Sequence, residues 1–402
     1  MRKKSKIPVF EKMDIEKCCG CEACSQICPK EAIYMNEDEE GFLFPFLDKG
    51  KCVNCHLCEQ VCPVLNQHKN KILSQKYYAG YAKDSLIVEE SSSGGMFSII
   101  ANEFMGMEGD NYVCGVVWKD DFKGTKHICV SGKEGLTDLK RSKYIQSEKK
   151  NVYIEIKQLL TAGKNVMFVG CPCEVAGLHS YLGKQYSNLY SVDLVCQGPT
   201  SPKAMREFVE EQEKKYKSKI CDLNMRYVGG TTWIPQWMKI KFESGKEVLK
   251  VFYETDIGRA LHIMQRPSCY QCAFAGTKRY SDITLGDFHG ADPNRNYYNA
   301  RGTSIIITNT SKGADLWKHI LQKDLVNIEV VQKDEITKSN PRIEKSWEPH
   351  KYRKIYSEYF VKYGIKKADK ISRTQKERIM IHIPYKIRPM VRRVYKIVKG
   401  KN

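Results

Sequence analysis

Two short cysteine-rich stretches decide how the start of this chain folds. The first is CCGCEACSQICP at residues 18–29, and the second is CVNCHLCEQVCP at residues 52–63. Both have the spacing C-x2-C-x2-C-x3-C-P, and each cysteine of the second stretch lies 34 residues after its counterpart in the first. The repeat therefore places cysteines at Cys18, Cys21, Cys24, Cys28, Cys52, Cys55, Cys58 and Cys62.

This spacing is typical of paired cubane iron–sulfur clusters. Three closely spaced cysteines bind three corners of one cluster, and in paired motifs the fourth cysteine binds the other cluster. Each proline fixes the direction of the chain after the fourth ligand. The repeat thus predicts two [4Fe–4S] clusters with crossed ligands. Cys18, Cys21 and Cys24 are expected to share one cluster with Cys62, and Cys52, Cys55 and Cys58 to share the other with Cys28.

The segment resembles the bacterial two-cluster ferredoxins, so we expect an α+β ferredoxin-like module over residues 13–66. Between the cysteine runs, EAIYMNEDEEGFLFPFLDKGKC predicts a strand, an acidic turn and a second strand. Disulfides and zinc are the alternatives, but thiols this close give poor disulfide geometry, and zinc usually takes two separated pairs. Cys19 lies outside the spacing and is expected to be a spare thiol, and His56 a loop residue.

Length and composition indicate a globular protein of two or three domains, with 402 residues of which 42% are hydrophobic. No apolar stretch is long enough for a transmembrane helix, and MRKKSKIPVF lacks the apolar core of a secretory signal. Seventeen cysteines without such a signal indicate a reducing compartment and metal binding rather than disulfides. We therefore expect a cytoplasmic location.

The net charge of +19 comes mainly from the C-terminal end. Residues 351–402 contain 17 Lys and Arg against 3 Asp and Glu. We expect residues 346–402 to form a basic tail, with an amphipathic helix from Val391 to Lys399 that lies weakly on the anionic inner face of the membrane. A solvated or body-packed tail is the alternative. Nucleic acid is not expected as a partner, because no recognisable binding motif accompanies the charge.

Residues 76–345 alternate between strand and helix patterns, which predicts an α/β domain with a mixed sheet. SSSGGMFSIIANEFM predicts a loop that leads into a helix, where backbone N–H groups could bind a phosphate. WMKIKFESGKEVLKVF predicts a hairpin that turns at Ser244 and Gly245. In SDITLGDFHG, Asp287 follows a strand, so its carboxylate is expected at an end of the sheet, either as an orienting group or as a plain turn residue.

A second set of cysteines lies in this domain. Cys173 and Cys196 follow predicted strands, and RPSCYQC adds Cys269 and Cys272. Four thiolates from three loops could bind a third [4Fe–4S] cluster. Buried or zinc-bound cysteine is the alternative from spacing alone.

The order of SSSGG, SKYIQS, GCPCEVAGL, DLVCQGPTSPK, RPSCYQC and SDITLGDF resembles the coenzyme F420 hydrogenase/dehydrogenase beta-subunit family. The resemblance covers roughly residues 14–345 and implies an α/β domain that holds FAD and iron–sulfur clusters. Two positions depart from the family pattern: Cys171 stands where threonine is common, so it is a spare thiol or an alternative ligand, and Arg141 stands where glycine is common. The implied residues are Ser92, Ser93, Gly94 and Gly95 along the flavin, Lys143 and Tyr144 facing the flavin or substrate, and Cys173, Cys196, Cys269 and Cys272 around the third cluster.

The combined expectation is an iron–sulfur flavoprotein oxidoreductase, with Lys143, Tyr144 and Asp287 as candidate catalytic residues. It would couple hydride chemistry at FAD, with coenzyme F420 or another small molecule as hydride donor or acceptor, to one-electron transfer through the clusters. A redox partner protein or ferredoxin would exchange the single electrons. The alternative is a non-catalytic subunit that relays electrons to a partner enzyme.

Overall fold

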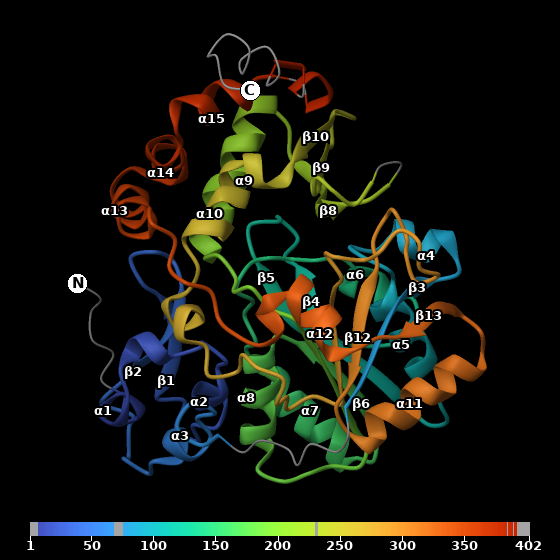
Figure 1. Ribbon diagram of the computed structural model, residues 1–402. Helices are drawn as coiled ribbons and strands as arrows, with labels where there is room; N and C mark the ends of the chain where they lie inside the picture. The colour runs from blue at the N-terminus through green and yellow to red at the C-terminus, as the bar shows by residue number, and fades with distance from the viewer. Residues whose placement is uncertain (1–6, 68–74, 230–231, 384, 389, 392–402) are drawn as a thin grey trace.

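A computed structural model of the chain describes residues 7–67, 75–229, 232–383, 385–388 and 390–391. The chain forms a small N-terminal module, a large mixed sheet covered by helices, and a second, smaller sheet with its own helices (Figure 1). The N-terminal module consists of α1 (Val9–Lys12), η1 (Ile15–Lys17), α2 (Ala23–Gln26), β1 (Ile33–Glu37), β2 (Leu43–Leu47) and α3 (Leu57–Gln60).

The hairpin predicted between the two cysteine runs is present in the module. Strands β1 and β2 pair antiparallel, with Ile33 opposite Leu47 and Glu37 opposite Leu43. Gly41 in the turn has a φ of 80°, a left-handed conformation that glycine adopts without steric cost. The hairpin lies between the two cysteine runs in the sequence. The short helices of the two runs, α2 and α3, lie next to each other in the module.

The large sheet is mixed, as the alternation of strands and helices predicts. Its strand order is β13-β3-β12-β11-β7-β6-β4-β5, and β4, β6, β7 and β11 run parallel. The edge strands are antiparallel to their neighbours. The strands are β3 (Lys76–Ala82), β4 (Asn111–Trp118), β5 (Thr125–Ser131), β6 (Asn165–Gly170), β7 (Leu189–Leu194), β11 (Ile283–Asp287), β12 (Ser304–Thr308) and β13 (Val326–Val330).

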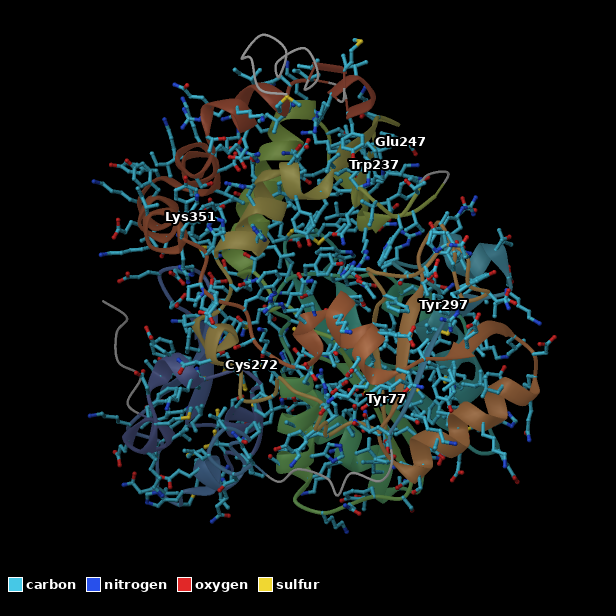
Figure 2. The ribbon with its side chains drawn as sticks, in the orientation of Figure 1. Tyr77, Trp237, Glu247, Cys272, Tyr297 and Lys351 are labelled. Carbon is cyan, nitrogen blue, oxygen red and sulfur yellow. A yellow bond between two sulfur atoms is a disulfide. The ribbon has the colours of Figure 1, made fainter. Side chains whose placement is uncertain are left out.

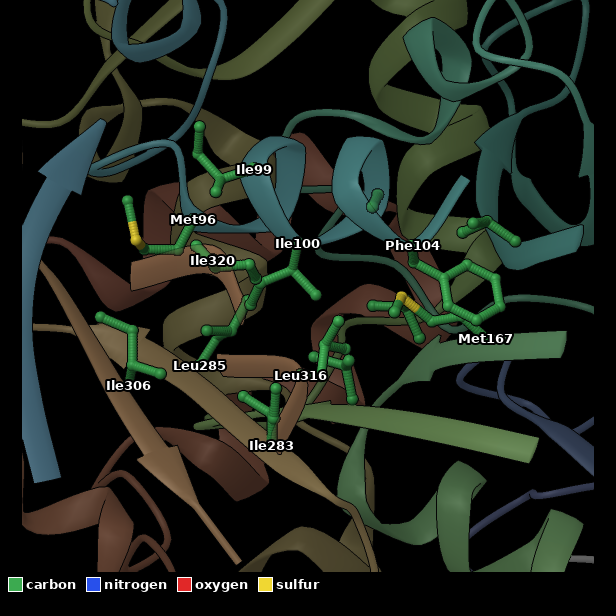
Figure 3. Packing of buried hydrophobic residues seen from close by; sticks show 14 of the residues in the cluster. Met96, Ile99, Ile100, Phe104, Met167, Ile283, Leu285, Ile306, Leu316 and Ile320 are labelled. Carbon is green, nitrogen blue, oxygen red and sulfur yellow. The ribbon is translucent and has the colours of Figure 1, made fainter. Parts of the chain in front are cut away.

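Apolar side chains of helices α5 and α11 meet those of strands β6, β11 and β12 on one face of this sheet (Figure 3). Helix α5 contributes Ile100 and Phe104 at a spacing of four residues, which places both on one helix face. Burial of this apolar surface is the main stabilising contribution to the domain. The covering helices are α4 (Ser85–Glu89), α5 (Met96–Met105), α6 (Leu136–Leu139), α7 (Val152–Thr161), α8 (Pro172–Leu182), α11 (Ser311–Gln322), α12 (Lys333–Ser339) and the turn η4 (Pro341–Ile343).

The hairpin predicted around Ser244 and Gly245 is present, but it belongs to a separate antiparallel sheet, β10-β9-β8, rather than to the large mixed sheet. A second hydrophobic core lies between this sheet and its helices. Its elements are α9 (Pro202–Tyr216), β8 (Ile220–Tyr227), β9 (Trp237–Phe242), β10 (Glu247–Val251), η2 (Phe252–Glu254), α10 (Asp256–Ile263), η3 (Pro267–Gln271), α13 (Arg353–Tyr363), α14 (Ile365–Ser372), α15 (Gln375–Met380) and η5 (Tyr385–Ile387).

The first part of the expected basic tail is packed into this second core. Tyr356 and Phe360 on α13, and Ile365 and Ala368 on α14, are at most 1% exposed. The basic residues therefore decorate helices whose other faces are buried. The amphipathic helix expected from Val391 to Lys399 falls almost entirely outside the described residues. Among the described residues, none of the helices has the length and apolar content needed to cross a membrane.

One disulfide corrects the expectation that the cysteines serve metal binding rather than disulfides. Cys114 on β4 and Cys129 on β5 face each other across the antiparallel pair and are joined by a disulfide. Neither cysteine belongs to any motif recognised in the sequence. Their partnership follows from strand register, which the spacing of cysteines along the chain does not reveal.

The packing of α13 predicts that this helix is needed for stability. Phe360→Ala removes a fully buried ring and should lower the free energy of unfolding by about 3–5 kcal/mol. Tyr363→Ala is the matched control, because this aromatic residue lies on the same helix but is 52% exposed, and its loss should cost at most about 0.5 kcal/mol. Denaturant unfolding of the anaerobically purified full chain measures both. Equal, small effects would show that α13 does not contribute to the core.

Candidate redox site

The N-terminal module contains two cavities whose linings separate the eight repeat cysteines into two groups. Each cavity has a volume of about 380 Å³, counting space open to solvent. The grouping is the crossed one that the spacing predicts, in which the last cysteine of each run joins the other run. The first cavity is lined by Cys18, Cys21, Cys24 and Cys62, with Cys19 beside them, and the second by Cys28, Cys52, Cys55 and Cys58.

The two cysteine loops share an unusual backbone feature. Glu22 and His56 occupy equivalent positions of the repeat and both have left-handed backbones, with φ of 65° and 58°. Non-glycine residues rarely adopt this conformation, which tightens the turn before each short helix. The backbone N–H of Ala32 donates to the Cys28 sulfur at 3.3 Å. These loops turn the sulfurs inward, as cluster ligation requires.

The electrostatics of these thiols favour a cationic ligand. Burial, followed by the charge of Glu59, raises the pKa of Cys58 to about 11. Burial, followed by the neighbouring Cys21, raises the pKa of Cys62 to about 12. Four thiolates this close repel one another unless iron compensates their charge. In the described parts of the chain, no group of three or more His, Cys, Asp or Glu side chains is placed to hold a single metal ion.

The two cavities differ in their exposure. In the first, Cys21 and Cys62 are buried, and Cys21 belongs to a hydrophobic cluster shared with the large domain. In the second, Cys55 is exposed and the adjacent Val53 is 58% exposed. The first cavity therefore faces the rest of the protein, and the second faces the surface.

Five cysteines of the large domain gather next to the first cavity. Cys171 follows the end of β6, Cys196 follows the end of β7, and their sulfurs are 3.7 Å apart. Gly198 has a φ of 92° and leaves no room for a side chain, because a Cβ atom there would lie 2.9 Å from the Cys269 sulfur. Cys272, marked in Figure 2, packs in the same hydrophobic cluster as Cys173 and Cys21.

Cys19, expected to be a spare, lies between the two sets of cysteines. Cys19 donates a hydrogen bond to the neighbouring Cys173 sulfur, and this bond together with burial raises the pKa of Cys19. Cys19 also contacts Cys21 through a second hydrogen bond. Cys19 therefore links Cys21 of the first cavity to Cys173 of the large domain. The spacing gave no indication of this contact, because it depends on how the module docks.

Buried polar groups fix the module on the large domain. Arg266 is 1% exposed, donates to the backbone oxygens of Cys18 at 2.7 Å and Leu43 at 2.9 Å, and lies over the Phe44 ring. Glu22 accepts hydrogen bonds from the backbone N–H groups of Lys149 and Lys150 at 3.0 and 3.1 Å. Hydrogen bonds to charged groups are stronger than those between neutral groups. These contacts therefore fix the position of the first cavity relative to the large domain.

The Ser/Gly loop lies at the end of β3 and leads into α5, as predicted. The Ser92 hydroxyl oxygen accepts from the Ser142 N–H at 2.8 Å, and the Ser93 hydroxyl donates to the Thr303 oxygen at 3.2 Å. The Gly94 N–H donates to the Ser304 hydroxyl at 3.0 Å, and Gly95 has a φ of 84°. The loop thus joins the stretch around Lys143 to the start of β12.

The three candidate catalytic residues lie in the same region but have different environments. Half-buried Lys143 donates to the backbone oxygens of Lys140 at 2.7 Å and Arg141 at 3.3 Å. Burial, reinforced by the Arg141 charge, lowers the pKa of Lys143 to about 7.

Tyr144 and Asp287 are brought together by Arg226 of β8, a residue that the sequence analysis missed. The Arg226 guanidinium donates to the Tyr144 hydroxyl at 3.3 Å and forms an ion pair with the Asp287 carboxylate. Little in the sequence indicated this residue, because only the structure shows that Arg226 lies among the buried residues of β8.

Strand direction places all these groups at one edge of the large sheet. Cys171, Cys196 and Asp287 stand at the carboxyl ends of the parallel strands β6, β7 and β11. Strand β12 runs the opposite way, so its first residue, Ser304, lies opposite Asp287 at this same edge. The neighbouring β3 ends there too and leads to the Ser/Gly loop. Ligands of open α/β sheets bind at such an edge.

Comparison with known proteins agrees with the resemblance seen in the motifs. Residues 163–334 match the family described as the C terminus of the coenzyme F420 hydrogenase/dehydrogenase beta subunit, and residues 17–66 match the 4Fe-4S dicluster domain. Among solved structures, the chain is similar to one from the F420-reducing [NiFe] hydrogenase complex of Methanosarcina barkeri. The identity is 16%, the match covers 76% of this chain and 93% of that chain, and the TM-score is 0.46. No curated protein gives a significant match.

The crossed grouping predicts which substitutions should behave alike. Cys28→Ala should remove the same cluster as Cys58→Ala, although Cys28 belongs to the first run, and Cys62→Ala should match Cys24→Ala. Each variant should lose about four irons per chain, and within a pair the electron paramagnetic resonance spectrum of the reduced protein should be the same.

Cys221→Ala is the control, since this exposed thiol lies on β8 outside both cavities. If Cys28→Ala instead lost the same cluster as Cys24→Ala, the crossed assignment would be wrong.

Proposed function

We propose that this protein is an iron–sulfur flavoprotein oxidoreductase that couples hydride exchange at FAD to one-electron transfer through three [4Fe–4S] clusters. The observation that carries this proposal is the crossed grouping of eight cysteines around two cavities, next to further cysteines at a ligand-binding sheet edge. Flavin supplies the chemistry that joins the two halves, because it exchanges electrons in pairs and singly.

The third cluster would be held by Cys173, Cys196, Cys269 and Cys272. Cys171, with its sulfur 3.7 Å from that of Cys196, is the alternative ligand. The hydrogen bond between Cys173 and Cys19 supports the choice of Cys173, because it directs this ligand toward the module. The cysteines would bind iron as thiolates, and all of them are partly shielded from solvent.

The flavin would lie along Ser92, Ser93, Gly94 and Gly95, at the sheet edge shared with the third cluster. Strands β7, β11 and β12 are consecutive in the sheet, so the ends of β7 and β12 lie about 10 Å apart. This separation permits direct electron transfer between the flavin and the third cluster. Lys143, Tyr144 and Asp287 would then face the reacting substrate, with Lys143 holding or releasing a proton near neutral pH.

The order of the groups supports an electron path that ends at the second cavity. Single electrons would leave or enter there, because Cys55 is exposed whereas the first cavity is buried against the large domain. The partner would be a redox protein or ferredoxin that docks over this surface. The hydride would come from or go to coenzyme F420 or another small molecule.

The same exposed second cavity would serve a subunit that only relays electrons. The relay function differs from the proposed one in needing no flavin. Quantitation of FAD in the anaerobically purified full chain separates the two: about one FAD per chain supports the oxidoreductase, and clusters without FAD support the relay.

Iron content tests the number of clusters. The wild-type chain should contain about twelve irons, and Cys173→Ala should reduce this to about eight and slow flavin reduction from the clusters. Cys171→Ala is the matched control and should change neither quantity. About eight irons in the wild type, or iron loss in Cys171→Ala alone, would contradict the proposed third ligand set.

The lowered pKa of Lys143 predicts a pH dependence of the flavin spectrum. Lys143 is protonated below about pH 7 and neutral above it, so the bound flavin should experience one positive charge less as the pH rises. An anaerobic titration of flavin absorption should show a transition near pH 7 that is absent in Lys143→Met.

The control for this titration is Lys140→Met. Lys140 lies on the same loop, but its amine pairs with Glu90 at 2.7 Å, and its removal leaves the backbone oxygen that Lys143 contacts. This variant should retain the transition. A transition that persists in Lys143→Met would assign the titration to another group.

A further inference from the structure

Arg226 is buried at the end of β8, and only one edge of its guanidinium is occupied. The side chain is 5% exposed. Its Nη1 donates to the Asp287 carboxylate and to the Tyr144 hydroxyl. These contacts fix the orientation of the planar group beside the proposed flavin and substrate region.

The other edge of the guanidinium has no acceptor among the described residues. Both Nε and Nη2 of Arg226 are shielded from solvent and lack a hydrogen-bond partner there, as does Nε1 of Trp233. The Arg226 Cζ atom lies 4.9 Å from the centre of the Trp233 ring. Three buried donors thus stand close together without an acceptor. Buried donors without acceptors are unfavourable, and a group of them indicates a missing ligand.

The chemistry of these donors defines the ligand. The Nε–H and Nη2–H groups of arginine are parallel and match two oxygens of one carboxylate or phosphate. The Trp233 indole N–H adds a third donor, and among the described residues no acidic side chain accepts a hydrogen bond from this edge. An oxyanion satisfies all these donors, whereas a neutral apolar ligand satisfies none.

We propose that the free edge of Arg226 binds an oxyanion group, carboxylate or phosphate, of the small molecule that exchanges a hydride at this site. The inference rests on the proposed function, because it describes the substrate of the same site. Asp287 is paired with Ser304 in the sheet, and Ser304 contacts Gly94, so Arg226 lies beside the proposed flavin loop.

The Trp233 ring packs on the Arg226 guanidinium, and His289 in turn packs on the Trp233 ring. His289 is exposed and stacks on the Trp233 ring, with ring centres 5.1 Å apart and planes 10° apart. The backbone of Trp233 is held by a hydrogen bond to the Ala300 oxygen at 2.9 Å. The Trp233 indole is therefore held beside Arg226 by ring contacts and by its own backbone.

The test uses acetate and inorganic phosphate as probes at constant ionic strength, with the anaerobic, cluster-loaded full chain. Flavin absorption and the melting temperature are measured against probe concentration. At least one probe should give a saturable response in both measurements. Arg226→Gln should weaken this binding by about tenfold or more, since it removes hydrogen bonds to a charged group.

Two further variants control for structure and for general charge. Trp233→Phe keeps the Arg226–Asp287 ion pair and an aromatic ring but removes the indole N–H together with part of the ring surface, so it should weaken binding less than Arg226→Gln, and it serves as the test if the latter does not fold. Arg141→Gln removes a half-exposed positive charge close by and should leave binding unchanged.

Several outcomes would overturn the proposal. One is the lack of a saturable response in the wild type, and another is equal binding in the wild type, Arg226→Gln and Trp233→Phe. If Arg226→Gln instead loses FAD at unchanged iron content, the oxyanion belongs to the cofactor and not to the substrate. Absence of FAD from the wild-type chain would refute the proposed function itself, and the melting temperature would still report whether the anion binds.

Discussion

The arrangement of this protein depends on the parallel direction of the central strands of its large sheet. Because β6, β7 and β11 run the same way, the segments that follow them emerge at one edge. That edge carries cysteines after β6 and β7, and Asp287 at the end of β11. A reversal of any of these strands would move its end to the far side of the sheet. The sheet therefore places the cysteines of the large domain and Asp287 side by side at one edge.

The features that were predictable from the sequence are those encoded over short distances. The C-x2-C-x2-C-x3-C-P repeat indicated the crossed grouping of the eight cysteines, because ligation by three neighbours is a property of one loop. The helix after the Ser/Gly loop and the hairpin at Ser244 and Gly245 follow from local turn chemistry. The contact between Cys19 and Cys173 was not predictable in this way, since the two cysteines are 154 positions apart and meet only through docking of the module.

The second core and the role of Arg226 were missed for a related reason. For residues 346–402 the excess of charge favoured a membrane-bound tail over a body-packed one, yet Tyr356 and Phe360 recur at helical spacing and are fully buried. Net charge describes the outward face of a helix and gives no information about its inward face. Arg226 was overlooked because its function depends on Asp287 and Tyr144, which come from two other parts of the chain.

The exposure of the cysteines increases from the large-domain side of the N-terminal module toward its surface. The first cavity shares a hydrophobic cluster with the cysteines of the large domain, and the second ends at exposed Cys55. Burial also strengthens the electrostatic interactions of the inner groups, because water screens them least. Arg266, buried against the Phe44 ring and the Cys18 backbone, places a fixed positive charge beside the first cavity. Such a charge stabilises negative charge in that cavity, against the cost of burying it. The contact that docks the module therefore also contributes to the electrostatics of the first cavity.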